Sequence, residues 1–232
     1  MDERTNTPER PHYLGHRQRL RERFERAGAD ALPDYEFLEL LLCLVIPRGD
    51  VKPLAKNILA RFGSLAGAMS AEREELASTA GIGAATVHML KLVHAAGLRI
   101  GREEVMSRPV IDNWQRLLDY CRASMAYAKN EQFRLLFLDR KNGLMADEVQ
   151  QRGTVDHTPV YTREVVKRAL ELGASAIIMV HNHPSGDTTP SKADIDVTHD
   201  VRGACEKLGI RLHDHVIIAK GGHSSFRSLG LL

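Results

Sequence analysis

The period of the apolar residues changes near residue 130, and this change limits the chain to two structurally different parts. Before it, apolar residues recur at the spacing of an amphipathic helix, as Leu38, Leu41 and Leu42 do. After it, short β-branched runs alternate with helical patterns, and "ASAIIMVHNH" (174–183) predicts a buried strand. We therefore predict an all-α part followed by an α/β (α+β) sheet domain.

The composition is that of a folded protein without a strong net charge. Hydrophobic residues make up 43%, aromatic residues 5%, and the formal net charge is +2. A core can therefore form, but a nucleic-acid surface built on base stacking is not expected. Contact with a polyanion would require a local patch of basic residues.

Three features predict a cytoplasmic protein. Cys43, Cys121 and Cys205 are far apart and odd in number, which indicates buried free thiols in a reducing compartment. The polar N-terminus resembles neither a signal peptide nor a transit peptide. No membrane contact is expected, because the longest apolar run, residues 37–46, is about half of the ~20 residues that a span needs.

Four segments are expected along the chain. Residues 1–13 form a disordered tail, 14–100 an all-α domain, 101–109 a charged linker that ends in proline, and 110–232 the sheet domain. The helix predicted over 16–27 is rich in arginine, which fits either a solvated face or a phosphate-contacting helix.

The turn Gly81-Ile82-Gly83 has the sequence of a helix-hairpin-helix motif. Its first glycine can take a positive φ, and the N–H groups at the start of the next helix suit a phosphate oxygen. Such contacts carry no base information, so DNA binding there would be non-specific. The alternative is a plain αα-hairpin, because the nearest following cations are only Lys91 and Arg99.

Turn and cap residues divide the sheet domain into elements. Asn142-Gly143 predicts a β-hairpin. Thr162 is a candidate N-cap for a helix that Gly173 ends, and Ser191 is a candidate N-cap for the next helix.

Two histidines at the end of the predicted strand form a candidate metal site. His181 and His183 are two positions apart, so their side chains point to one face of the strand. A chain reversal through Gly186 can bring the Asp194 carboxylate back to the same strand end. Two imidazoles, one carboxylate and one open position make a catalytic zinc site. The alternative is that the two histidines are ordinary polar residues of a loop.

Three further features bear on this site. The Ser191 hydroxyl could stabilise an oxyanion or serve only as the helix cap. A second pair, His213 and His215, has no downstream acid at comparable spacing, and we interpret it as structural with possible hydrogen bonds near the site. Spacing does not choose a base among five carboxylates, which are Glu131, Asp139, Asp147, Glu148 and Glu164.

The motif "HNHPSGDTTPSKAD" resembles the JAMM (MPN-plus) metalloprotease signature, in which ten residues separate the second histidine from the aspartate. With "LFLDRKNGLMADE", "LHDHVIIAKGGHSSFRSLGLL" and the helical "GADALPDYEFLELLL", the sequence is similar to the RadC family over nearly all of the chain after residue 14. Asn182 departs from the Ser or Thr that is common between the histidines of deubiquitinating members.

The resemblance implies a JAMM fold, a mixed sheet between helices. It implies one zinc ion on His181, His183 and Asp194, with Ser191 supporting the oxyanion. "EQFRLLF" matches the family's early-strand pattern, so the resemblance gives the role of base to Glu131.

Two functions from different classes remain open at this point. The first is a zinc-dependent hydrolase of the JAMM type, peptidase- or isopeptidase-like, that acts on a protein or peptide. The second is a DNA repair or recombination factor whose metal domain is a scaffold or a nuclease.

Overall fold

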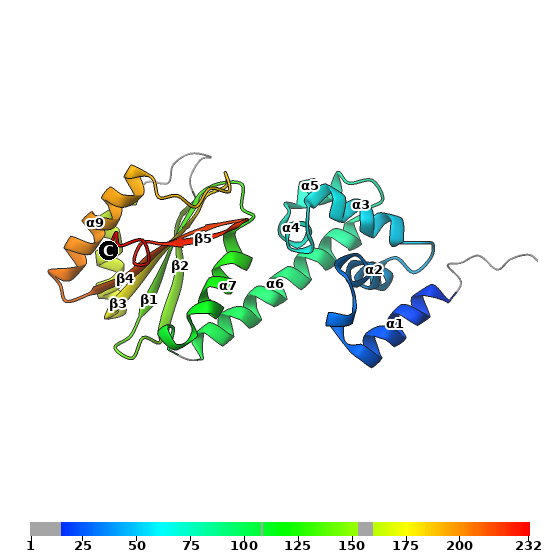
Figure 1. The fold of residues 1–232 in the computed structure, drawn as a ribbon, viewed down its shortest axis with the longest axis horizontal. Coiled ribbons are helices and arrows are strands. Elements are labelled where there is room, and N and C mark those ends of the chain that lie inside the picture. Colours follow the sequence, from blue (N-terminus) through cyan, green and yellow to red (C-terminus); the bar gives the residue numbers. More distant parts are fainter. Residues whose placement is uncertain (1–14, 108, 153–159) are drawn as a thin grey trace, which may run out of the picture. The chain divides into compact units, whose positions relative to one another are not determined.

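The computed structural model describes residues 15–107, 109–152 and 160–232 (Figure 1). The predicted tail over 1–13 therefore lies outside the described residues. The chain divides into two compact units, one ending at His94 and the other beginning at Ala95, and each is described by itself.

The N-terminal unit is all-α in its described part. Its elements are α1 (His16–Ala27), η1 (Ala29–Ala31), α2 (Asp34–Val45), α3 (Lys52–Phe62), α4 (Leu65–Ser70), α5 (Arg73–Ala77) and the first turns of α6 (Ala84–Met106). Apolar side chains at helical spacing, Leu38 and Leu42 among them, are fully buried in its core. Gly63 ends α3 in the left-handed region, at φ 78°.

The segment where we predicted a linker is mostly helical. Helix α6 continues to Met106, and the division between the two units falls within this helix. The reason is packing, because Val105 is buried in a core cluster of the second unit. The helix ends at Met106, three residues before Pro109, which has no backbone N–H to donate to a continuing helix.

The second unit contains a five-stranded mixed sheet. Its strands are β1 (Gln132–Leu138), β2 (Leu144–Arg152), β3 (Ala176–Asn182), β4 (Arg211–Ala219) and β5 (Gly222–Ser225), in the order β2-β1-β3-β4-β5. Strands β3 and β4 are parallel, whereas the other three neighbouring pairs are antiparallel. The α+β fold class is therefore confirmed, and the short strand β5 near the C-terminus completes the sheet.

Helices cover both faces of this sheet, α7 (Trp114–Met125) on one and α9 (Lys192–Glu206) on the other (Figure 1). Successive strand residues point to opposite faces. Leu136, Ile178 and Val216 accordingly pack with α7. Phe137 and Ile177 pack in the cluster that includes residues of α8 (Thr162–Leu172) and α9. Strand β3 is buried along its whole length.

Most of the predicted local signals are borne out, and one is wrong. The chain reverses between β1 and β2, with Asn142 at φ 61°, and Gly173 ends α8 in the left-handed region. Thr162 is not the N-cap of α8. Tyr161 occupies that position, and it makes no side-chain capping bond. The hydrophobic face of the helix, rather than a cap, accounts for its position.

The three cysteines are free and buried, as expected. Among the residues that the structure describes, no helix is long and apolar enough to cross a membrane.

A buried polar cluster joins α7 to the hairpin. Arg134 on β1 donates to both carboxylate oxygens of Asp147 on β2, at 2.8 and 2.6 Å. The Tyr120 hydroxyl donates to the same carboxylate and accepts from Arg134 at 3.1 Å. Burial and the bond to Asp147 raise the pKa of Tyr120 to about 12.

We expect Tyr120 to ionise about two pH units later than an exposed tyrosine, for which the pKa is about 10. Its pKa is raised in the folded state, so its contribution to stability is full below about pH 10 and is lost as the pH rises through about 12. When the pH is raised, the absorbance of ionised tyrosine should show a final increase near pH 12 that is absent from Tyr120→Phe. The control variant Tyr161→Phe, at an exposed tyrosine, should retain this increase. An unchanged titration curve in Tyr120→Phe would contradict this assignment.

Candidate metal centre

The end of β3 and the start of α9 bring three ligand side chains together. His181 belongs to β3 and His183 follows it directly. The chain then turns through Gly186, at φ 92°, and Asp194 occupies the third position of α9. The three side chains are the one group of three or more potential metal ligands within the described residues. The pair His213 and His215 forms no such group there.

The distances between the ligand atoms fit one small cation. The two histidine Nε2 atoms are 2.9 Å apart. The Asp194 oxygens lie 3.2 Å from Nε2 of His181 and 3.5 Å from Nε2 of His183. Ligands bound tetrahedrally to zinc at about 2.0–2.1 Å lie roughly 3.3–3.4 Å from one another. The donor set and its spacing therefore fit zinc.

A hydrogen-bonded chain behind His181 determines which of its nitrogens carries the proton. The Thr198 hydroxyl must donate to the Asp194 carbonyl oxygen, which only accepts. Thr198 therefore accepts from Nδ1 of His215 at 2.6 Å. Nε2 of His215 in turn accepts from Nδ1 of His181 at 2.8 Å. Nε2 of His181 is left with its lone pair toward the site.

His183 is oriented in the same sense by a separate bond. Its Nδ1 donates to the Asp187 carbonyl oxygen at 2.7 Å, which leaves Nε2 for the site. Two imidazole lone pairs and a carboxylate thus face one another at short range. Such an arrangement is repulsive unless a cation lies among the three groups. The fold therefore builds a cation site, which a proton or a metal ion can satisfy.

Electrostatics at the site agree with this interpretation. Hydrogen bonding to Asp194 raises the pKa of His183. Burial raises the pKa of Asp194, but the nearby imidazoles of His181 and His183 and the Ser191 hydroxyl outweigh it and hold that pKa far below its usual range. Burial, assisted by His181, lowers the pKa of His215 well below its usual value, so His215 is neutral.

Ser191 is the N-cap of α9, as predicted. Its hydroxyl accepts from the Asp194 N–H at 3.1 Å and donates to the Asp194 carboxylate at 2.6 Å. The capping role is therefore established, and an oxyanion role requires this hydroxyl to rotate away from Asp194.

The five candidate bases lie in different surroundings. Asp139 accepts two backbone N–H groups in the β1–β2 turn, Asp147 binds Arg134, and Glu148 binds Arg168 at 2.6 Å. Glu164 pairs with the exposed Arg163 in the first turn of α8. Glu131, which immediately precedes β1, is among the charges that raise the pKa of His183. Of the five carboxylates, Glu131 is therefore the one that influences His183 of the candidate cluster through its charge.

The sequence analysis did not single out Thr198, and it expected hydrogen bonds near the site from His215 without naming a partner. His215 was expected to be structural, and it is fully buried against His181. Thr198 lies four residues after Asp194 on α9, so both face the same side of that helix. That spacing was a usable signal, but only the pairing of β3 with β4 shows where His215 lies.

The Gly-Ile-Gly turn lies between α5 and α6 in the N-terminal unit. Gly81 has φ 84°, and a Cβ atom there would lie 3.2 Å from a methyl group of Leu54. Ile82 packs against the unit's core, and Gly83 borders open space.

Two basic side chains near this turn have partners within the unit. Arg61 donates to the hydroxyls of Ser78 and Thr79 at 2.7 and 2.9 Å. Lys91 instead donates to three carbonyl groups at the end of α4.

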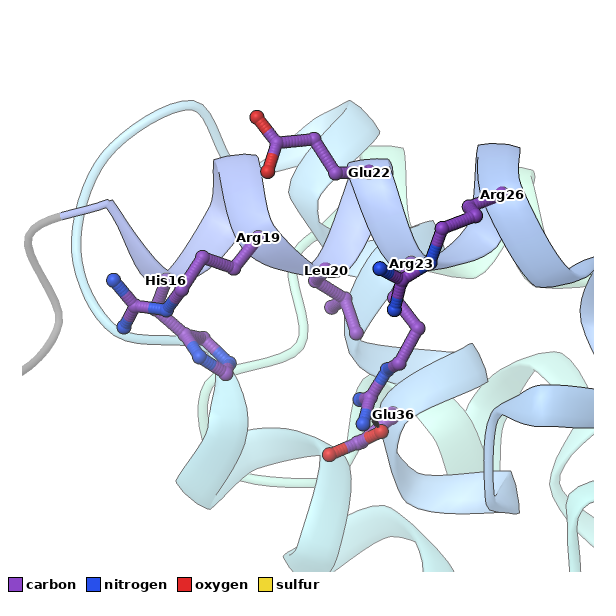
Figure 2. A pocket seen from close by; sticks show the side chains of 7 residues that line it. All are labelled: His16, Arg19, Leu20, Glu22, Arg23, Arg26 and Glu36. Carbon is purple, nitrogen blue, oxygen red and sulfur yellow. Dashed lines mark hydrogen bonds and ion pairs between the residues drawn. The ribbon is translucent and has the colours of Figure 1, made fainter.

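Helix α1 borders a hollow of about 440 Å³ in the same unit (Figure 2). Basic and acidic side chains line it together with the apolar Leu20, namely His16, Arg19, Glu22, Arg23, Arg26 and Glu36. Arg23 is paired with the buried Glu36, and Arg17 donates to two backbone carbonyl groups. Two of the arginines of α1 therefore hold the unit together.

Comparison with known proteins extends over almost all of the chain. The model of the RadC-like JAB domain matches residues 111–231, and the model of the UPF0758 N-terminal region matches residues 12–88. A UPF0758 protein of Rhodobacter capsulatus is 59% identical over 92% of this chain and all of its own length. A UPF0758 protein of Ruegeria pomeroyi is 57% identical over 96% of this chain and all of its own length.

We expect Thr198→Val to weaken metal binding by about 10–100-fold, because His215 loses the acceptor that determines its tautomer. The substitution preserves the volume of the buried side chain. Metal affinity is measured by competition with a chelator. Thr86→Val is the matched control, since Thr86 is also buried but lies in the other unit. Equal affinities in the two variants would contradict the role of the hydrogen-bonded chain.

Proposed function

Because this chain belongs to the RadC-like JAB domain family, we propose that its second unit is a zinc-dependent hydrolase of the JAMM type, peptidase- or isopeptidase-like. The observation that carries the proposal is the cluster of His181, His183 and Asp194, in which both imidazoles present an Nε2 lone pair to one point. The family relationship supports the same ligand set.

Zinc is the ion that these residues fit. Two neutral nitrogen ligands and one carboxylate leave a fourth position open, which distinguishes catalytic from structural zinc sites. His183 and Asp194 are only partly buried, so solvent and substrate can reach that position. A bound zinc ion would supply Lewis acidity that polarises a water molecule and the substrate carbonyl.

The side chains around the centre supply the remaining chemistry. The Glu131 carboxylate accepts a proton from the attacking water, whose oxygen forms a bond to the carbonyl carbon. The carbon–nitrogen bond then breaks, and Glu131 gives the proton to the leaving amine. The Ser191 hydroxyl, once rotated away from Asp194, donates to the oxyanion. Water is the only co-reactant, and its atoms are divided between the acid and the amine.

Purified protein should contain about one zinc ion per chain, and His183→Ala should lose it. Elemental analysis by mass spectrometry measures the metal content. His213→Ala is the matched control, because His213 bonds to Asn142 in the β1–β2 turn rather than to the site. A wild-type protein that takes up no zinc from solution would overturn the proposal.

Glu131→Gln should keep zinc but lose at least about 10²-fold in turnover, because an amide cannot accept and return the proton. Turnover is measured by incubating the zinc-loaded protein with a library of peptides and isopeptide-linked peptides and identifying the cleavage products by mass spectrometry. Glu164→Gln is the matched control from the same unit. Equal cleavage by zinc-loaded wild type and Glu131→Gln would exclude Glu131 as the base.

A second candidate function is non-specific DNA binding by the N-terminal unit, as in a repair- or recombination-associated factor. Two observations favour it, the glycine turn that precedes α6 and the Arg61 guanidinium beside that turn. In that case the metal domain would act as a scaffold or as a nuclease.

If the turn contacts phosphate, Gly83→Ala should weaken DNA binding, because the added methyl group projects into open space at the turn. Gly97→Ala on α6 is the control, since its methyl group is also free of contacts. Fluorescence anisotropy with branched and single-stranded DNA at two salt concentrations should show affinity falling steeply as salt rises. Equal affinities for the two variants would leave the turn with a structural role only.

A further inference from the structure

Asn182 lies between the two candidate ligand histidines and is fully buried. A buried amide needs partners for its donor and its acceptor. Its Oδ1 accepts from the Gln132 N–H at 2.8 Å, and its Nδ2 donates to the Asn130 carbonyl oxygen at 3.2 Å. Exchanging oxygen and nitrogen would set two donors against each other at Gln132, so the hydrogen bonds determine the amide's orientation.

The two partners of Asn182 bracket Glu131. One bond reaches the carbonyl group of the preceding residue, and the other reaches the N–H group of the following residue. In a parallel sheet, a residue of one strand bonds in the same way to the two residues that flank its neighbour on the next strand. Backbone pairing of β1 with β3 extends from Leu138 to Phe133, so the side-chain amide holds the chain just beyond that ladder.

We propose that Asn182 is a positioning residue that holds the backbone of Glu131 and thereby directs its carboxylate to the metal centre, an inference that rests on the proposed role of Glu131 as base. Asparagine suits this task because one planar group offers both a donor and an acceptor. A serine or threonine hydroxyl has a single hydrogen and a shorter reach.

The position of Asn182 in the sequence makes this coupling direct. His181 and His183 are adjacent to it, so one short segment of chain carries two ligands and the anchor of the base. Movement of this segment would shift both parts of the site together. Displacement of a catalytic group by about 1 Å can reduce the rate by 10²-fold, so such coupling has a functional consequence.

The test is a double-mutant cycle between Asn182→Leu and Glu131→Gln, with Co²⁺ as the metal probe. Leucine has the same number of side-chain heavy atoms and the same branching at Cγ as asparagine, and it removes both hydrogen bonds. The visible absorption of the Co²⁺-loaded protein is recorded as a function of pH, because it reports a group that interacts with the open coordination position. Asn113→Leu, at the start of α7, is the matched control.

The measured quantity is the pH at which the change in the Co²⁺ absorption is half complete, here called the spectral midpoint. We expect Glu131→Gln to shift this midpoint and Asn182→Leu to shift it in the same direction by a smaller amount. In the Glu131→Gln background, Asn182→Leu should add no shift, and all variants should bind one Co²⁺ ion. Asn113→Leu should behave as wild type. Amide exchange at Gln132 should quicken in Asn182→Leu, while Leu135 stays protected because its strand pairing persists.

Two results would overturn the inference while leaving the proposed function intact. The first is that Asn182→Leu shifts the midpoint equally in wild type and in the Glu131→Gln variant. The second is that Asn182→Leu does not shift the midpoint although Glu131→Gln does. A titration that Glu131→Gln leaves unchanged would instead refute the role of Glu131 itself. If Asn182→Leu does not fold, Asn182→Ser enters the same cycle and is subject to the same criteria.

Discussion

The central position of β3 in the sheet is the constraint on which the rest of this site depends. The strand pairs with β1 on one side and with β4 on the other, and all of its residues are buried. Its end presents His181 and His183, and the turn that follows returns the chain to α9 and Asp194. Each neighbour of β3 adds one component, because β4 supplies His215 and the chain before β1 carries Glu131, the proposed base.

Hydrogen bonds convert this arrangement into a defined chemical state. The chain from the Asp194 carbonyl through Thr198 and His215 determines the tautomer of His181. It also joins two of the three candidate ligands through atoms that do not face the metal position. Since every member is buried or partly buried, water competes little for these bonds, and the orientation of the ligands is built into the folded protein.

The three candidate ligands were predictable from the sequence, whereas their supporting residues were not. His181 and His183 share one face of a strand and a short turn leads to Asp194, so local periodicity made the cluster a candidate, and the family resemblance singled it out. Spacing left five carboxylates as equal candidates for the base. In the structure, Asp147 binds Arg134 and Glu148 binds Arg168. The helical continuation of α6 was missed because a charged segment was interpreted without knowledge of the core that buries Val105.

The amino-acid sequence by itself determined the division into helical and mixed parts, most element boundaries, the free cysteines and the three candidate ligands. These properties follow from periods of two and 3.6 residues and from turn chemistry, which act over a few neighbours in the chain. Only the tertiary structure decided that His215 supports His181 and that Asn182 brackets Glu131. Those contacts join residues 34 to 52 positions apart, and strand pairing, which no local pattern encodes, brings them within hydrogen-bonding distance.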